Sequence, residues 1–126
     1  MKLKTLFIFQ ALVSLINGGM LVIATAFYIS FFGFTDPTQE TILMSRLLGA
    51  ALLGYCVTAW LARDSGESIG QKAIVSGLFF GNAVGLIGSI IGQLAGIPNM
   101  MGWSIVGLYL ILALGFGFFL FFSPTE

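Results

Sequence analysis

Carboxamide or guanidinium side chains interrupt the long apolar stretches of this chain at five positions, and these groups could carry chemistry. Such groups are costly in an apolar surrounding unless they are paired, so each one marks a packing contact or a site. None of them is an Asp, Glu, Lys or His, which argues against proton-coupled transport and favours hydrogen bonding or anion binding. The five are Gln10, Asn17, Arg46, Asn82 and Gln93.

Arg46 is the only charged group among them, and its position allows two interpretations. It lies about one turn inside its apolar stretch, close enough to extend to the membrane surface. It also shares a helical face with Gly49 and Ala50, which would direct it inward. An inward guanidinium needs an acceptor at its own depth, and Gln93 is the best candidate, followed by Tyr109 and Ser104. It is then either a structural arginine or an anchor for an anionic ligand or a lipid head group.

A second polar feature runs along the first apolar stretch, where Gln10, Ser14 and Asn17 form one stripe. Asn17 and Asn82 are expected at a similar depth near the middle of the bilayer. A hydrogen bond between these two amides, worth about 1 kcal/mol, is the simplest prediction. The alternative is the wall of a polar route for ions or small solutes.

These groups must be positioned by membrane-spanning helices, as the composition indicates. The chain has 126 residues, of which 58% are hydrophobic and 8% charged, with a mean hydropathy of +1.05. Soluble domains carry roughly a quarter charged residues. Four apolar stretches, 6–32, 42–61, 73–94 and 103–122, reach the ~20 residues that a helix needs to cross a bilayer. We predict an all-α integral membrane four-helix bundle, formed as a single transmembrane domain over residues 1–126.

Several classes of function are disfavoured by what the chain lacks. The net charge is zero, so no basic field attracts nucleic acid. There is no histidine and one cysteine, Cys56, which removes the usual metal-ligand sets and the common nucleophile–base pairs. We therefore expect neither a metal nor an enzyme.

The basic residues predict the orientation of the spans in the membrane. With four spans, both termini and the second connection lie on one side, which carries Lys2, Lys4, Arg63 and Lys72. The other side has only Arg46. The positive-inside rule then places both termini in the cytoplasm, with the protein multi-pass in the inner (plasma) membrane.

The connections carry signals for helix starts and stops. Asp36 and Pro37 predict a capped helix beginning at Pro37. Ser68 and Gln71 have the spacing of a capping box before the third span. Residues 96–99, which read GIPN, predict a short break, so the third and fourth spans should be antiparallel neighbours.

Small residues predict how the spans pack, because close approach between membrane helices depends on them. The glycines of the third span cover two adjoining helical faces, so we expect that span to lie at the centre of the bundle and to be packed from both sides. The glycines concerned are Gly77, Gly81, Gly85, Gly88 and Gly92, with Gly49 and Gly54 as a matching surface on the second span.

The second to fourth spans also carry short stretches that resemble a group of small bacterial four-helix integral membrane proteins. The similar segments read RLLGAALLG at 46–54, WLAR at 60–63 and GQLAG at 92–96, followed by GW at 102–103. The resemblance implies a four-helix membrane fold and brings no activity with it.

Together these features favour a non-enzymatic protein that acts as an accessory, structural or assembly subunit of a larger membrane complex. Its partners would be the lipid bilayer and other membrane protein subunits. Two alternatives stay open. One is a small homo-oligomeric channel or transporter lined by Arg46, Gln93, Asn17 and Asn82. The other is a protein that binds a lipid, a quinone or a pigment between its helices; no other cofactor is expected.

Overall fold

The computed structural model describes residues 2–95 and 102–122, and all the regular secondary structure over these residues is helical. Four of its five helices are long and apolar enough to cross a membrane, which supports a multi-pass membrane protein. The last three of these helices agree with the predicted spans to within about one turn. The bounds are α1 Leu3–Ile23, α2 Thr25–Ser30, α3 Gln39–Ala62, α4 Ile69–Leu94 and α5 Gly102–Phe121.

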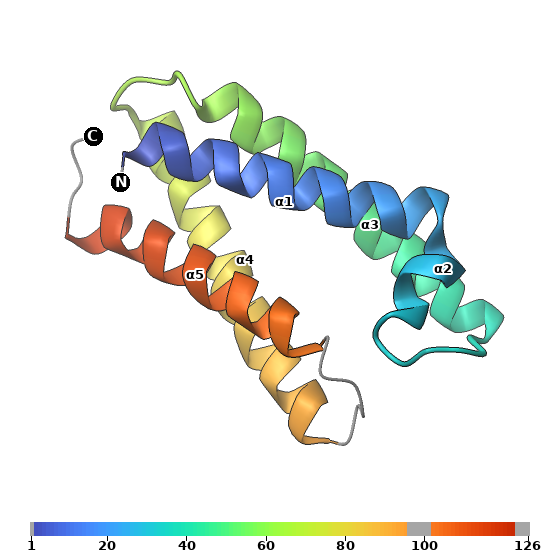
Figure 1. The fold of residues 1–126 in the computed structure, drawn as a ribbon. Coiled ribbons are helices and arrows are strands. Elements are labelled where there is room, and N and C mark those ends of the chain that lie inside the picture. Colours follow the sequence, from blue (N-terminus) through green and yellow to red (C-terminus); the bar gives the residue numbers. More distant parts are fainter. Residues whose placement is uncertain (1, 96–101, 123–126) are drawn as a thin grey trace.

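The four long helices form two antiparallel hairpins, α1 with α3 and α4 with α5 (Figure 1). The hairpins meet where α1 and α4 begin and where α3 and α5 end, and they diverge towards the opposite end (Figure 1). We call these the joined end and the open end. The prediction that the last two spans are antiparallel neighbours is confirmed.

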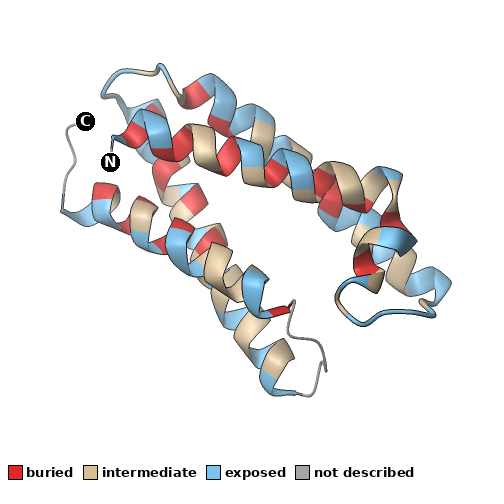
Figure 2. Cartoon of the chain, in the orientation of Figure 1, coloured by how far each residue is buried: buried red, intermediate tan, exposed pale blue. Residues whose placement is uncertain are grey.

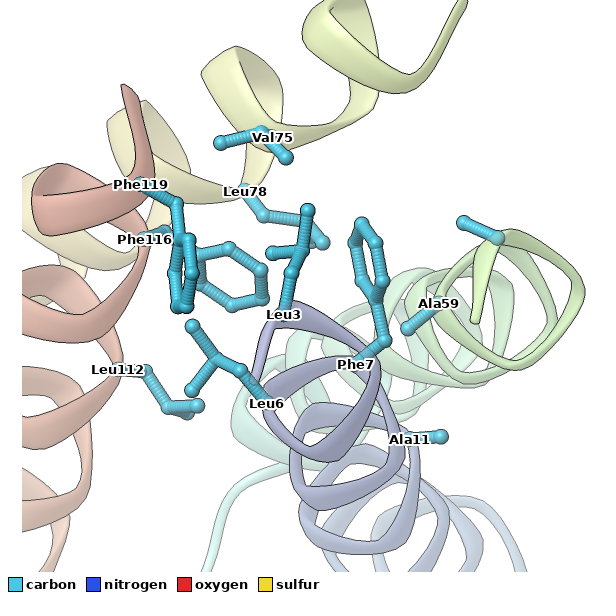
Figure 3. Close-up of a cluster of buried hydrophobic side chains, with 11 residues drawn as sticks. Leu3, Leu6, Phe7, Ala11, Ala59, Val75, Leu78, Leu112, Phe116 and Phe119 are labelled. Carbon is cyan, nitrogen blue, oxygen red and sulfur yellow. The ribbon is translucent and has the colours of Figure 1, made fainter. Parts of the chain in front are cut away.

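An apolar cluster fills the joined end and holds the two hairpins together (Figure 3). The rings of Phe7 on α1 and Phe116 on α5 lie at its centre, fully buried, with their centroids 5.7 Å apart. Val75 and Leu78 come from α4, and Ala59 comes from α3. All four long helices therefore contribute to one core. Figure 2 places most buried residues of α4 and α5 in the halves nearest the joined end.

The prediction that the third span is central is wrong. The central position belongs to α1, which contacts α2, α3 and α5. In its most apolar stretch α1 is 39% buried, against 17% for α4. The physical reason is the divergence of the hairpins, which leaves the open-end half of α4 with α5 as its one neighbour among the described helices.

The glycines of α4 consequently do not form the two-sided packing surface that their spacing predicts. A Cβ atom placed on Gly77, Gly88 or Gly92 would meet no described atom within 4 Å. Gly85 differs, because the Tyr109 ring of α5 lies directly against it. Gly54 of α3 is also open. Contact between α4 and α5 depends on single ring-against-glycine contacts rather than on a continuous glycine ladder.

The closest helix approach is instead between α1 and α3, at Gly18 and Gly49. A Cβ on either glycine would lie 2.9 Å from the backbone carbonyl oxygen of the other. Only glycine permits two helix backbones to come this close. This contact fixes where the first hairpin crosses.

The first apolar stretch is not the single helix predicted over 6–32. It breaks at Ala24, whose backbone leaves the helical region with φ −123° and ψ 53°. The hydroxyl of Thr25 donates to the carbonyl oxygen of Leu21 at 2.5 Å, the acceptor that its own amide would use in a continuous helix. Such side-chain bonding is a known cause of helix bends. The break lets α2 turn away from the axis of α1, as Figure 1 shows.

The start of α3 also differs from its prediction. The helix begins at Gln39 rather than Pro37, because the hydroxyl of Thr38, and not the Asp36 carboxylate, accepts the cap bond from the amide of Thr41 at 3.1 Å. The Ser68 cap of α4 is confirmed by its bond from the amide of Gln71 at 3.0 Å. The predicted break at 96–99 lies outside the described residues.

Candidate functional site

A cavity of about 360 Å³ lies between the two hairpins, and residues of all five helices line it. Its volume falls in the range of small-molecule binding sites. Leu112, which also belongs to the joined-end core, lies at one end. Ile29 and Phe32, which come from α2 and the turn after it, contribute at the other. The cavity thus begins above the joined-end core and continues towards the open end.

Amide side chains form a hydrogen-bonded floor between the hairpins. Asn82 on α4 donates through Nδ2 to Gln10 Oε1 on α1 at 2.9 Å and to the carbonyl oxygen of Leu78 at 2.8 Å. Gln10 in turn donates to the hydroxyl of Ser14 at 2.7 Å. Because a backbone carbonyl only accepts, the Leu78 bond fixes the orientation of the Asn82 amide. Its Oδ1 remains as an acceptor with no hydrogen bond to a described residue.

A second polar pair positions α2 beside the cavity. The hydroxyl of Tyr28 on α2 donates to Oδ1 of Asn17 on α1, and Asn17 Nδ2 donates to the carbonyl oxygen of Val13 at 2.8 Å. These bonds, together with the break at Ala24, hold α2 folded against α1. Without that fold the residues following Ala24 would not close this side of the cavity.

All three tyrosines of the chain line this cavity, one each from α2, α3 and α5. The hydroxyls of Tyr55 and Tyr109 have no hydrogen-bond partner among the described residues. The Tyr55 hydroxyl lies 3.8 Å from the position of a Cβ on Gly81 of α4, so this side chain extends across the cavity from one hairpin to the other. The Tyr109 ring lies on Gly85, one turn further along α4.

None of the described residues that line the cavity is Asp, Glu, Lys or Arg, so they give it no formal charge. No group of three or more His, Cys, Asp or Glu residues that could hold a metal occurs within the described ranges. Its chemistry is therefore that of neutral hydrogen-bonding groups set in apolar and aromatic walls. Burying a charged ligand there would carry a large desolvation cost.

Three of the five residues singled out from the sequence line the cavity, namely Gln10, Asn17 and Asn82. The predicted hydrogen bond between Asn17 and Asn82 does not form, since Asn82 bonds Gln10 and Asn17 bonds Tyr28. The reason is that α2 folds back and supplies Asn17 with a nearer partner.

Arg46 and Gln93 lie away from the cavity and from each other. Arg46 is exposed on α3, so the inward interpretation is wrong. Gln93 lies on the other hairpin, against Gly102 at the start of α5. The predicted Arg46–Gln93 contact fails because the hairpins diverge at the end where both residues lie.

The sequence interpretation missed Tyr28 and Tyr55 as site residues. A signal for them existed, because a tyrosine inside an apolar span has a ring that lipid accepts and a hydroxyl that needs a partner. Spacing alone does not indicate that tyrosines from three different helices converge.

No protein-family model, no curated protein and no solved structure matches this chain. We therefore argue its function from the geometry of the cavity.

Proposed function

We propose that this protein binds an uncharged, membrane-soluble molecule in the cavity between its hairpins. One observation carries the proposal: an otherwise apolar chain gathers all three of its tyrosines and three of its intramembrane amides around the same space. An apolar pocket with a few convergent polar groups is typical of ligand sites. The polar end of the ligand would contact the hydroxyls and amides, and its apolar part would contact the aliphatic walls or the surrounding lipid.

The joined-end core favours binding over conduction. Below the floor formed by Gln10 and Asn82, the rings of Phe7 and Phe116 fill the space between the hairpins with dry apolar contacts. A channel needs polar groups or an open passage along its whole length. The structure of one chain therefore supports a site that is closed towards the joined end.

Filling the cavity through Gly81 should remove the bound molecule. In Gly81→Leu the Cβ itself fits, 3.8 Å from the Tyr55 hydroxyl, but the rest of the side chain would occupy the cavity. We expect protein purified in mild detergent to release an apolar molecule on organic extraction, detected by mass spectrometry. The Gly81→Leu variant should retain at most about a tenth of the wild-type amount, a loss of about 1.4 kcal/mol or more.

The matched control is Gly77→Leu, one turn away on α4, where an added side chain meets no described atom within 4 Å. This variant should retain the wild-type amount. Equal retention in both variants would mean that the extracted molecule is bulk lipid and that the cavity is not its site.

For the setting of this site, we propose a four-helix bundle in the inner (plasma) membrane with both termini in the cytoplasm. Support comes from the basic residues near the joined end, where Lys4 and Arg63 lie 3.1 Å and 3.7 Å from the carboxylate oxygens of Asp64. Lys72 lies in the first turn of α4, at the same end. Arg46 lies nearer the open end, so the excess of basic residues is at the joined end, which the positive-inside rule assigns to the cytoplasm.

We also propose that the protein acts as an accessory or assembly subunit of a larger membrane complex. The open glycine face of α4 favours this second role. Gly77, Gly88 and Gly92 leave that face without a neighbour in the described chain, and small-residue faces in membranes are typical helix contacts. Cross-linking in intact membranes from a photoreactive side chain at Ile87, which is 58% exposed, should capture a partner subunit. Capture of lipid alone would contradict this role.

A further inference from the structure

We infer that the molecule held between the hairpins is a quinone, a flat ring with two carbonyl oxygens and an apolar tail. This inference rests on the proposed function and names the chemical class of its ligand. It follows from the charge, the hydrogen-bonding capacity and the shape of the cavity.

The absence of charged side chains in the cavity lining favours a neutral ligand. With no Asp, Glu, Lys or Arg in the lining, a fatty-acid anion or a phosphate head group would have no counter-charge. Such a group would lose its hydration without compensation. The free hydrogen-bonding groups of the cavity are therefore best matched by uncharged oxygen atoms of the ligand.

The hydrogen-bonding groups of the cavity require acceptors on both hairpins. The hydroxyls of Tyr55 on α3 and Tyr109 on α5 are without partners among the described residues. Asn17 uses one of its two amide hydrogens on Val13 and has the second left. Both hydrogens of Asn82 are already used. The hydroxyl oxygen of a long-chain alcohol lies at one point of the cavity, whereas the two carbonyl oxygens of a quinone lie at opposite ends of its ring and can each accept from a different tyrosine.

The walls favour a flat ring. Five aromatic side chains line the cavity, the three tyrosines together with Phe32 and Phe34. Tyr55 and Tyr109 approach α4 at Gly81 and Gly85, about 6 Å apart along the helix. A flat ring with an oxygen at each end can accept from a hydroxyl on each hairpin while its faces lie against aromatic neighbours. Gly81 lines the cavity without a side chain, whereas Gly85 is covered by the Tyr109 ring.

The test uses the full chain in nanodiscs of phosphatidylcholine and a radiolabelled para-benzoquinone that carries a decyl chain. We expect saturable binding, and we expect a decylbenzene of the same shape without carbonyls to bind at least about tenfold more weakly, because it loses both hydrogen bonds. Tyr55→Phe and Tyr109→Phe should each weaken quinone binding by about three- to tenfold. Both should leave the affinity for the carbonyl-free compound unchanged, which also shows that the variants are folded.

The outcomes separate this inference from the function on which it rests. The inference is overturned if the quinone and decylbenzene bind with equal affinity. It is also overturned if neither tyrosine substitution changes the affinity for the quinone. Diacylglycerol or a long-chain alcohol could instead bind in place of the quinone, with Gly81→Leu abolishing that binding. This result would contradict the quinone inference and support the proposed ligand site. If Gly81→Leu affects the binding of none of these probes, both proposals fail.

Discussion

Replacing Gly49 with valine is expected to separate α1 from α3 and to lower the free energy of unfolding by about 3 kcal/mol. A Cβ at this position would lie 2.8 Å from Cγ2 of Val22 and 2.9 Å from the backbone oxygen of Gly18. A backbone atom cannot rotate away as a side chain does, so the two helices must shift apart. Titration of the detergent-solubilised protein with dodecyl sulfate, followed by circular dichroism, measures the loss.

Gly54→Val is the matched control, because it puts the same β-branched residue into the same helix. An added Cβ there meets no described atom within 4 Å. We expect a change below about 0.5 kcal/mol, as for substitutions without new contacts. Similar losses in both variants would mean that helix propensity, and not the Gly18–Gly49 approach, accounts for the effect.

Phe116→Ala is expected to loosen the joined end and to cost about 2 kcal/mol. The ring is fully buried and packs against Phe7 with centroids 5.7 Å apart. In a membrane the separated helices leave this ring in lipid, so the cost is the loss of packing and the residual cavity rather than transfer to water. The same dodecyl sulfate titration measures it.

Phe118→Ala provides the comparison two residues further along α5. Its ring is 50% exposed, and lipid can fill the space that it leaves. This variant should lose less than about 1 kcal/mol. If Phe118→Ala cost as much as Phe116→Ala, the two hairpins would not be joined through the core around Phe7.

The last three long helices could be predicted from the sequence because length and hydropathy decide them locally. Helix α4 and its Ser68 cap follow from a serine placed three residues before Gln71. The break at Ala24 could not be predicted in this way, since it has no proline and depends on the Thr25 hydroxyl taking the carbonyl of Leu21. Whether the Thr25 hydroxyl bonds this carbonyl depends on the packing around the two residues.

The arrangement of the helices could not be predicted from the sequence, for a different reason. Glycine spacing on α4 indicates that close approach is permitted, but it does not say which helix approaches. The contact formed instead between Gly18 and Gly49. Once these two glycines bring α1 and α3 together, α4 and α5 pair separately, and the cavity is the space between the two hairpins.

Only the amide residues of the candidate site could be predicted from the sequence. Gln10, Asn17 and Asn82 stand out because carboxamides are rare in apolar spans. Their partners depend on the fold, and the tyrosines that complete the cavity come from helices whose relative positions no local pattern encodes. Arg46, the most conspicuous residue in the sequence, is exposed on α3 and takes no part.

The most direct test is an electron cryo-microscopy map of the full chain in lipid nanodiscs, with a bound antibody fragment to aid alignment. We expect two hairpins joined around Phe7 and Phe116, with non-protein density between Tyr55 and Tyr109. A map with α4 packed between α1 and α3, and with protein side chains filling the space between those two tyrosines, would contradict it.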